Sequence, residues 1–301
     1  MELLTTPDAR FENLPDFPWT PSFVDVARGD GTGTLRVAVI DEGPRDAPVV
    51  LMLHGEPSWS FLYRKCIRVA LAAGLRVVAP DLPGFGRSDK PAARTDYSFQ
   101  RHVDWMRAVL DALALRDITL LCQDWGGLIG LRLVGEEPAR FRGVVASNTF
   151  LPTGDQPVSS AFLKWQKYSQ ESPDFPIGKI FERSVARPLA PAVLAAYEAP
   201  FPDEASKAGA RAFPLLVPTS PDDPAAPANR RAWEGLRAFD RPFVTAFGDS
   251  DPITRGADMV LQALIPGAKG QPHVTLARAG HFSQEDAGEE LGAVVVRLVC
   301  G

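Results

Sequence analysis

The 301-residue chain lacks several features that mark particular classes of protein. Its net charge is −5 and it has no long cluster of Lys and Arg, so the electrostatic signature of a nucleic-acid-binding protein is missing. Its three cysteines have no C-x-x-C spacing, and the N-terminus has no basic region followed by an apolar run. No apolar stretch approaches the roughly 20 residues of a membrane span. We therefore expect a cytoplasmic protein with neither nucleic acid nor a membrane as its partner.

What the chain does have is apolar sequence in a regular rhythm. With 45% hydrophobic residues it can bury a large core. Short apolar runs alternate with segments of helical spacing, which indicates an α/β fold with a mostly parallel sheet and helices on both faces. We predict strands at 35–41, 49–53, 75–79, 118–122, 141–147, 243–247 and 273–277. We predict helices at 97–115, 128–134, 256–264 and from about 285 onwards.

The alternation of predicted strands and helices stops between residues 151 and 230. This segment carries many prolines, several aromatic residues and helical pieces, but no good buried strand. Such a composition is typical of a helical insertion. We therefore predict a core domain formed by residues 1–150 and 231–301, with a helical cap inserted over residues 151–230.

The most informative stretch is ITLLCQDWGGLIG, residues 118–130. An apolar run stops at a polar pair, and two glycines follow before an apolar pattern of helical spacing resumes. We interpret this stretch as a strand, a sharp turn and a helix, with Asp124 on the turn. A side chain on such a turn is exposed at the carboxyl edge of the sheet, beside the backbone N–H groups of a helix start. The usual form of the motif presents a serine hydroxyl there, whereas this chain presents a carboxylate.

Other predicted strand ends also carry polar residues, and their order along the chain is informative. Asp124 is followed by GDSDP at residues 248–252 and then by AGHF at residues 279–282. Nucleophile, acid and histidine occur in this order in the α/β-hydrolase triad. Alone, Asp124 could be a helix N-cap, and Asp249 or Asp251 could be a turn residue. Because all three pieces occur together, we predict a triad of Asp124, His281 and one of these two aspartates.

His281 is the best candidate for the base among the four histidines of the chain. His54 precedes Gly55 in the turn that should face the oxyanion, His102 lies in a predicted helix, and His273 opens a predicted strand. A structural role suits these three better than a catalytic one.

Motifs spread over most of the chain resemble those of the haloalkane dehalogenases of the α/β-hydrolase superfamily. The Trp directly after Asp124 and the segment YEAPFPD are narrow signals, whereas DLPGFGRSD occurs across the superfamily. The resemblance implies hydrolysis of a haloalkane to a primary alcohol and halide, with no cofactor and no metal. The matching motifs are HGEPSW at 54–59, DLPGFGRSD at 81–89, QDWGG at 123–127, YEAPFPD at 197–203 and AGHFSQE at 279–285.

The chemistry of the residues agrees with this resemblance. A carboxylate with an ordinary pKa near ~3.9 is ionised at neutral pH, so Asp124 can attack a saturated carbon without a base to activate it. The departing halide needs hydrogen-bond donors, and an indole N–H is a donor only. Trp125 is one such donor. Matching the family backwards from the cap motif implies Trp165 as the second donor, with Trp233 as the alternative.

The resemblance also implies how the alkyl ester on Asp124 would be hydrolysed. His281 would deprotonate a water molecule, and the backbone N–H groups of Glu56 and Trp125 would hold the oxyanion. Some relatives take the acid from the strand before the cap, but this chain has Ser147-Asn148 there and no carboxylate.

The acid must therefore come from residues 248–251, and the resemblance favours Asp251 over Asp249. Relatives that bind halide through an Asn after His-Gly have that side chain where this chain has Glu56, which favours a cap tryptophan instead. The pocket should be apolar because haloalkanes offer few polar handles. The positions that the resemblance implies for its lining are Leu128, Phe162, Phe213, Pro214, Val217 and Ile253.

Three other functions compete with this interpretation. An epoxide hydrolase would share the aspartate nucleophile and would need an acid for the alkoxide, for which Tyr168 and Tyr197 are available. A haloacid dehalogenase should have an arginine near the nucleophile, where this chain has Trp125. A binding protein that has lost catalysis should lack a triad member, and none is missing. We expect a monomer or a weak dimer that binds a small haloalkane, water and halide.

Overall fold

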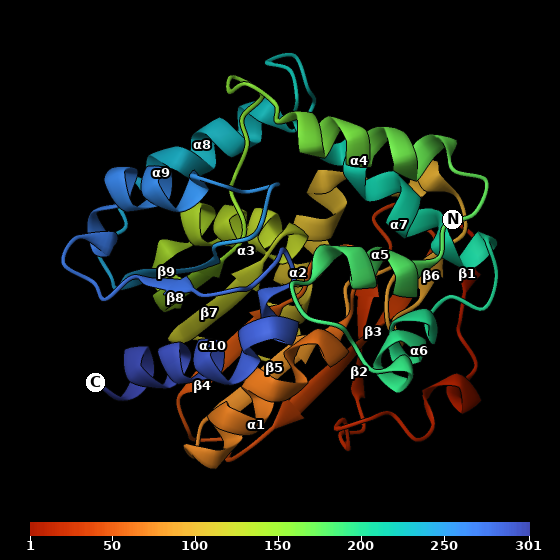
Figure 1. Cartoon of the computed structure of the whole chain (residues 1–301), viewed down its shortest axis with the longest axis horizontal. Coiled ribbons are helices and arrows are strands. Elements are labelled where there is room, and N and C mark those ends of the chain that lie inside the picture. The colour runs from red at the N-terminus through yellow and green to blue at the C-terminus, as the bar shows by residue number, and fades with distance from the viewer.

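The computed structural model describes all 301 residues and has one large sheet at its centre (Figure 1). The sheet has the strand order β10-β9-β8-β7-β4-β5-β3-β2. All pairs from β10 to β5 are parallel, and β3 pairs antiparallel with both β5 and β2. The strands are β2 (Ser22–Ala27), β3 (Thr34–Glu42), β4 (Val49–Leu53), β5 (Arg76–Pro80), β7 (Ile118–Gln123), β8 (Phe141–Ser147), β9 (Phe243–Gly248) and β10 (Val274–Leu276).

The predicted mostly parallel sheet is confirmed, and the reason lies in the apolar runs. Every residue of β4 and β7 is buried, as expected for strands covered on both faces. The antiparallel β3 alternates between exposed and buried residues over its first half. Outside the main sheet, β1 (Leu3–Leu4) pairs with β6 (Lys90–Pro91), which holds the N-terminal arm.

Helices cover both faces of the sheet. On one face, α1 (Arg64–Ala72) packs against α10 (Ser283–Cys300), and on the other α3 (Trp125–Glu136) packs against α2 (Phe99–Ala112) and α8 (Ala226–Leu236) (Figure 1). Near the C-terminal sheet edge, α9 (Ala257–Leu264) follows β9. No helix is long and apolar enough to span a membrane.

Four short helices follow β8 and lie above the carboxyl edge of the sheet (Figure 1). They are α4 (Ser160–Glu171), α5 (Ile177–Ser184), α6 (Pro191–Glu198) and α7 (Ala208–Ala212). The boundary that we predicted at residue 230 falls inside α8, which packs along α3. A Cβ on Gly235 of α8 would lie 1.9 Å from the carbonyl oxygen of Gly135 on α3, so the two backbones touch. We propose that the cap ends before α8.

A buried polar cluster joins the cap to the core. Two guanidinium nitrogens of Arg64 on α1 bind the Glu285 carboxylate on α10, at 2.5 and 2.7 Å. The hydroxyl of Tyr197 on α6 donates to the same carboxylate. Nearby, the indole N–H of Trp59 donates to the Ala196 carbonyl oxygen (3.1 Å). Because every charge in the cluster is paired, it can hold α6 against the core without leaving a buried charge alone.

Candidate active site

The site is built around the turn between β7 and α3. Asp124 occupies this turn with φ +48° and ψ −126°, a conformation that costs a non-glycine residue about 1–3 kcal/mol. Its backbone N–H donates to the Asn148 carbonyl oxygen (3.1 Å), and its carbonyl oxygen accepts from the Thr149 hydroxyl (2.8 Å). A Cβ on Gly127 would lie 2.0 Å from Thr149 Oγ1, so the second glycine of the motif allows this close approach. The turn is therefore held by the two residues that directly follow β8.

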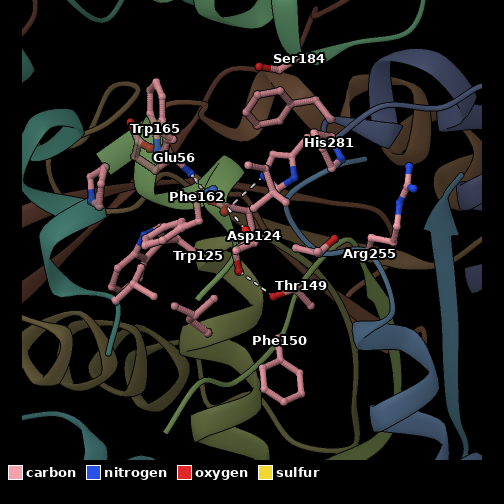
Figure 2. Close-up of a pocket in the computed structure, with 18 of the residues that line it drawn as sticks. Glu56, Asp124, Trp125, Thr149, Phe150, Phe162, Trp165, Ser184, Arg255 and His281 are labelled. Carbon is pink, nitrogen blue, oxygen red and sulfur yellow. Dashed lines mark hydrogen bonds and ion pairs between the residues drawn. The ribbon is translucent and has the colours of Figure 1, made fainter. Parts of the chain in front are cut away.

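His281 lies between two carboxylates, of which Figure 2 shows Asp124. Its Nε2 is 3.3 Å from Asp124 Oδ2, and its Nδ1 is 2.9 Å from Asp251 Oδ2. The exposed Asp249 instead accepts from the Ser250 hydroxyl (2.7 Å) and from a backbone N–H of the neighbouring loop. Of the two aspartates that the sequence left open, Asp251 is thus the one beside the histidine.

Asp251 is held in place by neighbours on both sides. It is 2% exposed and accepts hydrogen bonds from Asn148 Nδ2 (3.0 Å) and from the backbone N–H of Ile253 (2.8 Å). Asn148 also accepts from the Gly248 backbone N–H (2.9 Å), so it ties β8 to the loop that carries the acid. We noted Asn148 only as a missing carboxylate, because sequence order does not show which side chain an amide will contact.

The three groups shift one another's pKa values. Burial raises the pKa of Asp251, but the His281 charge and several hydrogen bonds outweigh it and hold this pKa well below its usual range. Burial lowers the pKa of His281, but Asp251 and Asp124 together raise it to about 10. These shifts favour a protonated His281 paired with an ionised Asp251.

The turn after β4 supplies the other contact to the Asp124 carboxylate. The backbone N–H of Glu56 donates to Asp124 Oδ1 (2.8 Å). A Cβ on Gly55 would lie 2.5 Å from the same oxygen, so only glycine fits there. The backbone N–H of Trp125 is the first of α3 and has no partner within its own helix. Each carboxylate oxygen of Asp124 thus has its own partner, Glu56 on one side and His281 on the other.

Two tryptophans line the cavity on the same side of Asp124 (Figure 2). Trp125 is 2% exposed and packs against Phe99 and Phe213, with ring centroids 5.1 and 4.5 Å apart. Trp165 on α4 reaches the cavity from the cap. Trp233 does not line the cavity, and its indole N–H donates to the carbonyl oxygen of Leu151 (2.8 Å). Trp233 is therefore excluded as the second donor.

The cavity has a volume of about 480 Å³. Phe213 is a correction to our prediction, because it is fully buried behind Trp125 and does not reach the cavity. Neither Tyr168 nor Tyr197 lines the cavity. Phe150, Ile180 and Val185 do line it, although no sequence motif marked them. The predicted positions that line it are Leu128, Phe162, Pro214, Val217 and Ile253.

Comparisons with known proteins agree with this architecture. A family model described as the alpha/beta hydrolase fold matches residues 48–288. A haloalkane dehalogenase of Psychrobacter cryohalolentis is 57% identical over 299 residues, covering 99% of this chain and 98% of the relative. Another, from Mycolicibacterium paratuberculosis, is 52% identical over 291 residues, covering 97% of this chain and 96% of the relative.

A solved structure of another haloalkane dehalogenase is also similar to this chain. The haloalkane dehalogenase DpaA from Paraglaciecola agarilytica NO2, described as tetrameric, superposes with a TM-score of 0.90 at 37% identity and covers 97% of each chain. The relatives and this structure match the chain over nearly its whole length. The chain therefore belongs to the haloalkane dehalogenases, hydrolases with the α/β-hydrolase fold that act on carbon–halide bonds.

Proposed function

We propose that this protein hydrolyses haloalkanes to an alcohol and a halide through an alkyl ester on Asp124. The observation that carries the proposal is the environment of the Asp124 carboxylate. It lies between the Glu56 backbone N–H (2.8 Å) and His281 (3.3 Å), at a cavity that two indoles line. This arrangement presents a carboxylate nucleophile to a cavity whose indole N–H groups can receive an anion.

In the first step, an oxygen of Asp124 attacks the carbon that bears the halogen. The carbon–oxygen bond forms as the carbon–halogen bond breaks, and the halide leaves with the bonding electrons. The halide needs no proton, but it needs donors without competing acceptors. The indole N–H groups of Trp125 and Trp165 would supply them, and the apolar walls keep competing water away.

In the second step, the state of His281 changes because the ester has formed. Asp124 loses its charge on alkylation, which removes part of the interaction that raises the pKa of His281. The histidine can then release its proton to solvent and take a proton from a water molecule, whose oxygen attacks the carbonyl carbon of the ester and leaves an oxyanion on the former carbonyl oxygen. Asp251, 2.9 Å from Nδ1, would orient the ring and stabilise the imidazolium that forms again.

The oxyanion of the second step would be stabilised by the turn after β4 and by the start of α3. The Glu56 backbone N–H already contacts an Asp124 oxygen, and the Trp125 backbone N–H has no helical partner. Collapse of this intermediate would release the alcohol and regenerate the carboxylate. Each donor would act where charge develops, as in other acyl-transfer sites.

The alternative, an epoxide hydrolase with cap tyrosines as its acid, has less support. The hydroxyl of Tyr197 donates to buried Glu285, and Tyr168 stacks on Trp165 outside the cavity. Neither tyrosine is where an alkoxide leaving group would form.

Incubation with 1,2-dibromoethane and 1-bromobutane in weak buffer tests the proposal. We expect equal release of bromide and acid, with styrene oxide unchanged. Asp124→Asn should abolish the release because it removes the nucleophile. Turnover of styrene oxide, together with no halide release from a broad panel of haloalkanes, would overturn the proposal.

A further inference from the structure

The side chain of Glu56 lies in the wall of the cavity and forms no salt bridge. It is 5% exposed, and its Oε1 is buried without a hydrogen-bond partner. The other buried glutamate, Glu285, contrasts with it, because Arg64 and Tyr197 satisfy its carboxylate. Burying an ionised carboxylate without a salt bridge costs far more free energy than burying a neutral carboxyl group.

The surroundings of Glu56 favour its uncharged form. Burial raises the pKa of Glu56 well above its usual range, and the charge of Asp124 adds to the rise. The charge of His281 and a hydrogen-bond interaction with the Trp165 side chain offset only part of this effect. Asp124 and His281 are the charged groups that act on Glu56 from the core, and from the cap it meets Trp165, which does not titrate.

The position of Glu56 relative to the reacting groups is the second part of the argument. Its backbone N–H is bonded to Asp124 Oδ1, so its side chain starts beside the nucleophile. Figure 2 shows Glu56 next to Trp165, on the same side of Asp124 as Trp125. A neutral carboxyl group has one O–H donor, whereas an ionised one only accepts. The donor of Glu56 and the two indole donors therefore lie around the same part of the cavity.

We propose that Glu56, in its uncharged form, is a third hydrogen-bond donor for the halide and that its ionisation weakens halide binding. The inference rests on the proposed function, because it concerns the same leaving anion. Ionisation would act in two ways. The new negative charge would repel the halide, and the carboxylate would compete for the indole N–H of Trp165.

Bromide binding measured by tryptophan fluorescence tests the proposal without turnover. The dissociation constant would be determined across a pH series at constant ionic strength for the wild type, Glu56→Gln and Glu182→Gln. Glutamine keeps N–H donors but does not titrate. Glu182 is exposed on α5 and does not line the cavity, so its variant is a matched control for the loss of one charge.

We expect wild-type affinity to fall by about tenfold per pH unit once the pH exceeds the pKa of Glu56, as one linked proton requires, and the Glu182→Gln profile to be the same. The Glu56→Gln profile should be flatter. His281 also titrates in the alkaline range, so the series is repeated in a His281→Asn background. In that background, the pH dependence of bromide affinity should persist when Glu56 is present and disappear when glutamine replaces it. A profile unchanged by Glu56→Gln, or abolished by His281→Asn alone, would overturn the proposal.

Wild-type protein alone provides a second measurement if Glu56→Gln does not fold. The infrared difference spectrum on bromide binding at neutral pH should contain a shifted carbonyl band of a protonated carboxylic acid. The absence of such a band would refute the role of Glu56. Neither bromide binding nor the infrared spectrum depends on catalysis. The proposed function, in contrast, is refuted if the wild type releases no halide. The failure of one proposal can therefore be distinguished from the failure of the other.

Discussion

Replacing His281 with phenylalanine should separate the two proposed steps. The ring size is nearly conserved, but the base is lost. The contact that holds Asp124 Oδ1, the Glu56 backbone N–H at 2.8 Å, does not involve the histidine. Attack on the haloalkane should therefore continue, whereas hydrolysis of the ester should nearly stop. The variant should accumulate as an alkyl-enzyme.

The expected size of the defect follows from the role of the histidine. A positioned general base contributes roughly 10²–10⁴-fold to a proton-transfer step. Its loss therefore raises the barrier to ester hydrolysis by about 3–5 kcal/mol. Removing the cation 3.3 Å from Asp124 Oδ2 also frees that oxygen, so alkylation should not be limited by a lost contact. Ester hydrolysis should therefore slow, relative to alkylation, by roughly 10²–10⁴-fold.

Intact-protein mass spectrometry after incubation with 1-bromobutane measures the adduct directly. We expect a mass increase equal to one butyl group in place of one hydrogen, together with one equivalent of bromide. Asp124→Asn serves as the control and should gain no mass. Steady turnover by His281→Phe close to the wild-type rate, or one equivalent of bromide without a mass increase, would refute the covalent mechanism.

Two further predictions concern the cap. Trp165→Phe should weaken bromide binding by about ten- to a hundredfold, the loss of one hydrogen bond to an ion, whereas Trp233→Phe should not change it because that N–H is already used. Equal effects of the two variants in a bromide titration would contradict this assignment. Glu285→Gln should lower the free energy of unfolding by about 3–5 kcal/mol because it leaves buried Arg64 unpaired. Urea denaturation measures this, with exposed Glu289→Gln as the control, and a loss as small as that of the control would rule out a buried ion pair.

Much of the core architecture was predictable from local pattern. The predicted strands 49–53 and 141–147 coincide with β4 and β8, because buried parallel strands are continuous apolar runs with polar residues at their ends. Helix ends were less accurate. The helix predicted from residue 97 begins at Phe99, where the Ser98 hydroxyl accepts the Arg101 backbone N–H and so caps the first turn.

The cap was less predictable, and the prediction for Phe213 shows why. The segment around it suggested a wall of the pocket, but the ring lies behind Trp125 and packs against His102 and Phe85. Which face of a short cap helix points inward depends on how the cap sits on the core, and no periodicity in so short a segment specifies it.

The sequence by itself predicted the candidate reacting groups, because chain order and residue chemistry point to Asp124, His281 and a donor at Trp125 without coordinates. Only the tertiary structure decided what depends on distance between segments far apart in the chain. It placed Asp251 rather than Asp249 beside His281, and it paired the indole N–H of Trp233 with the Leu151 carbonyl oxygen. It also left one oxygen of the buried Glu56 carboxyl group without a hydrogen-bond partner. The physical reason is that burial and hydrogen bonding are properties of the folded surroundings, whereas the kind of reacting group is a property of the residue.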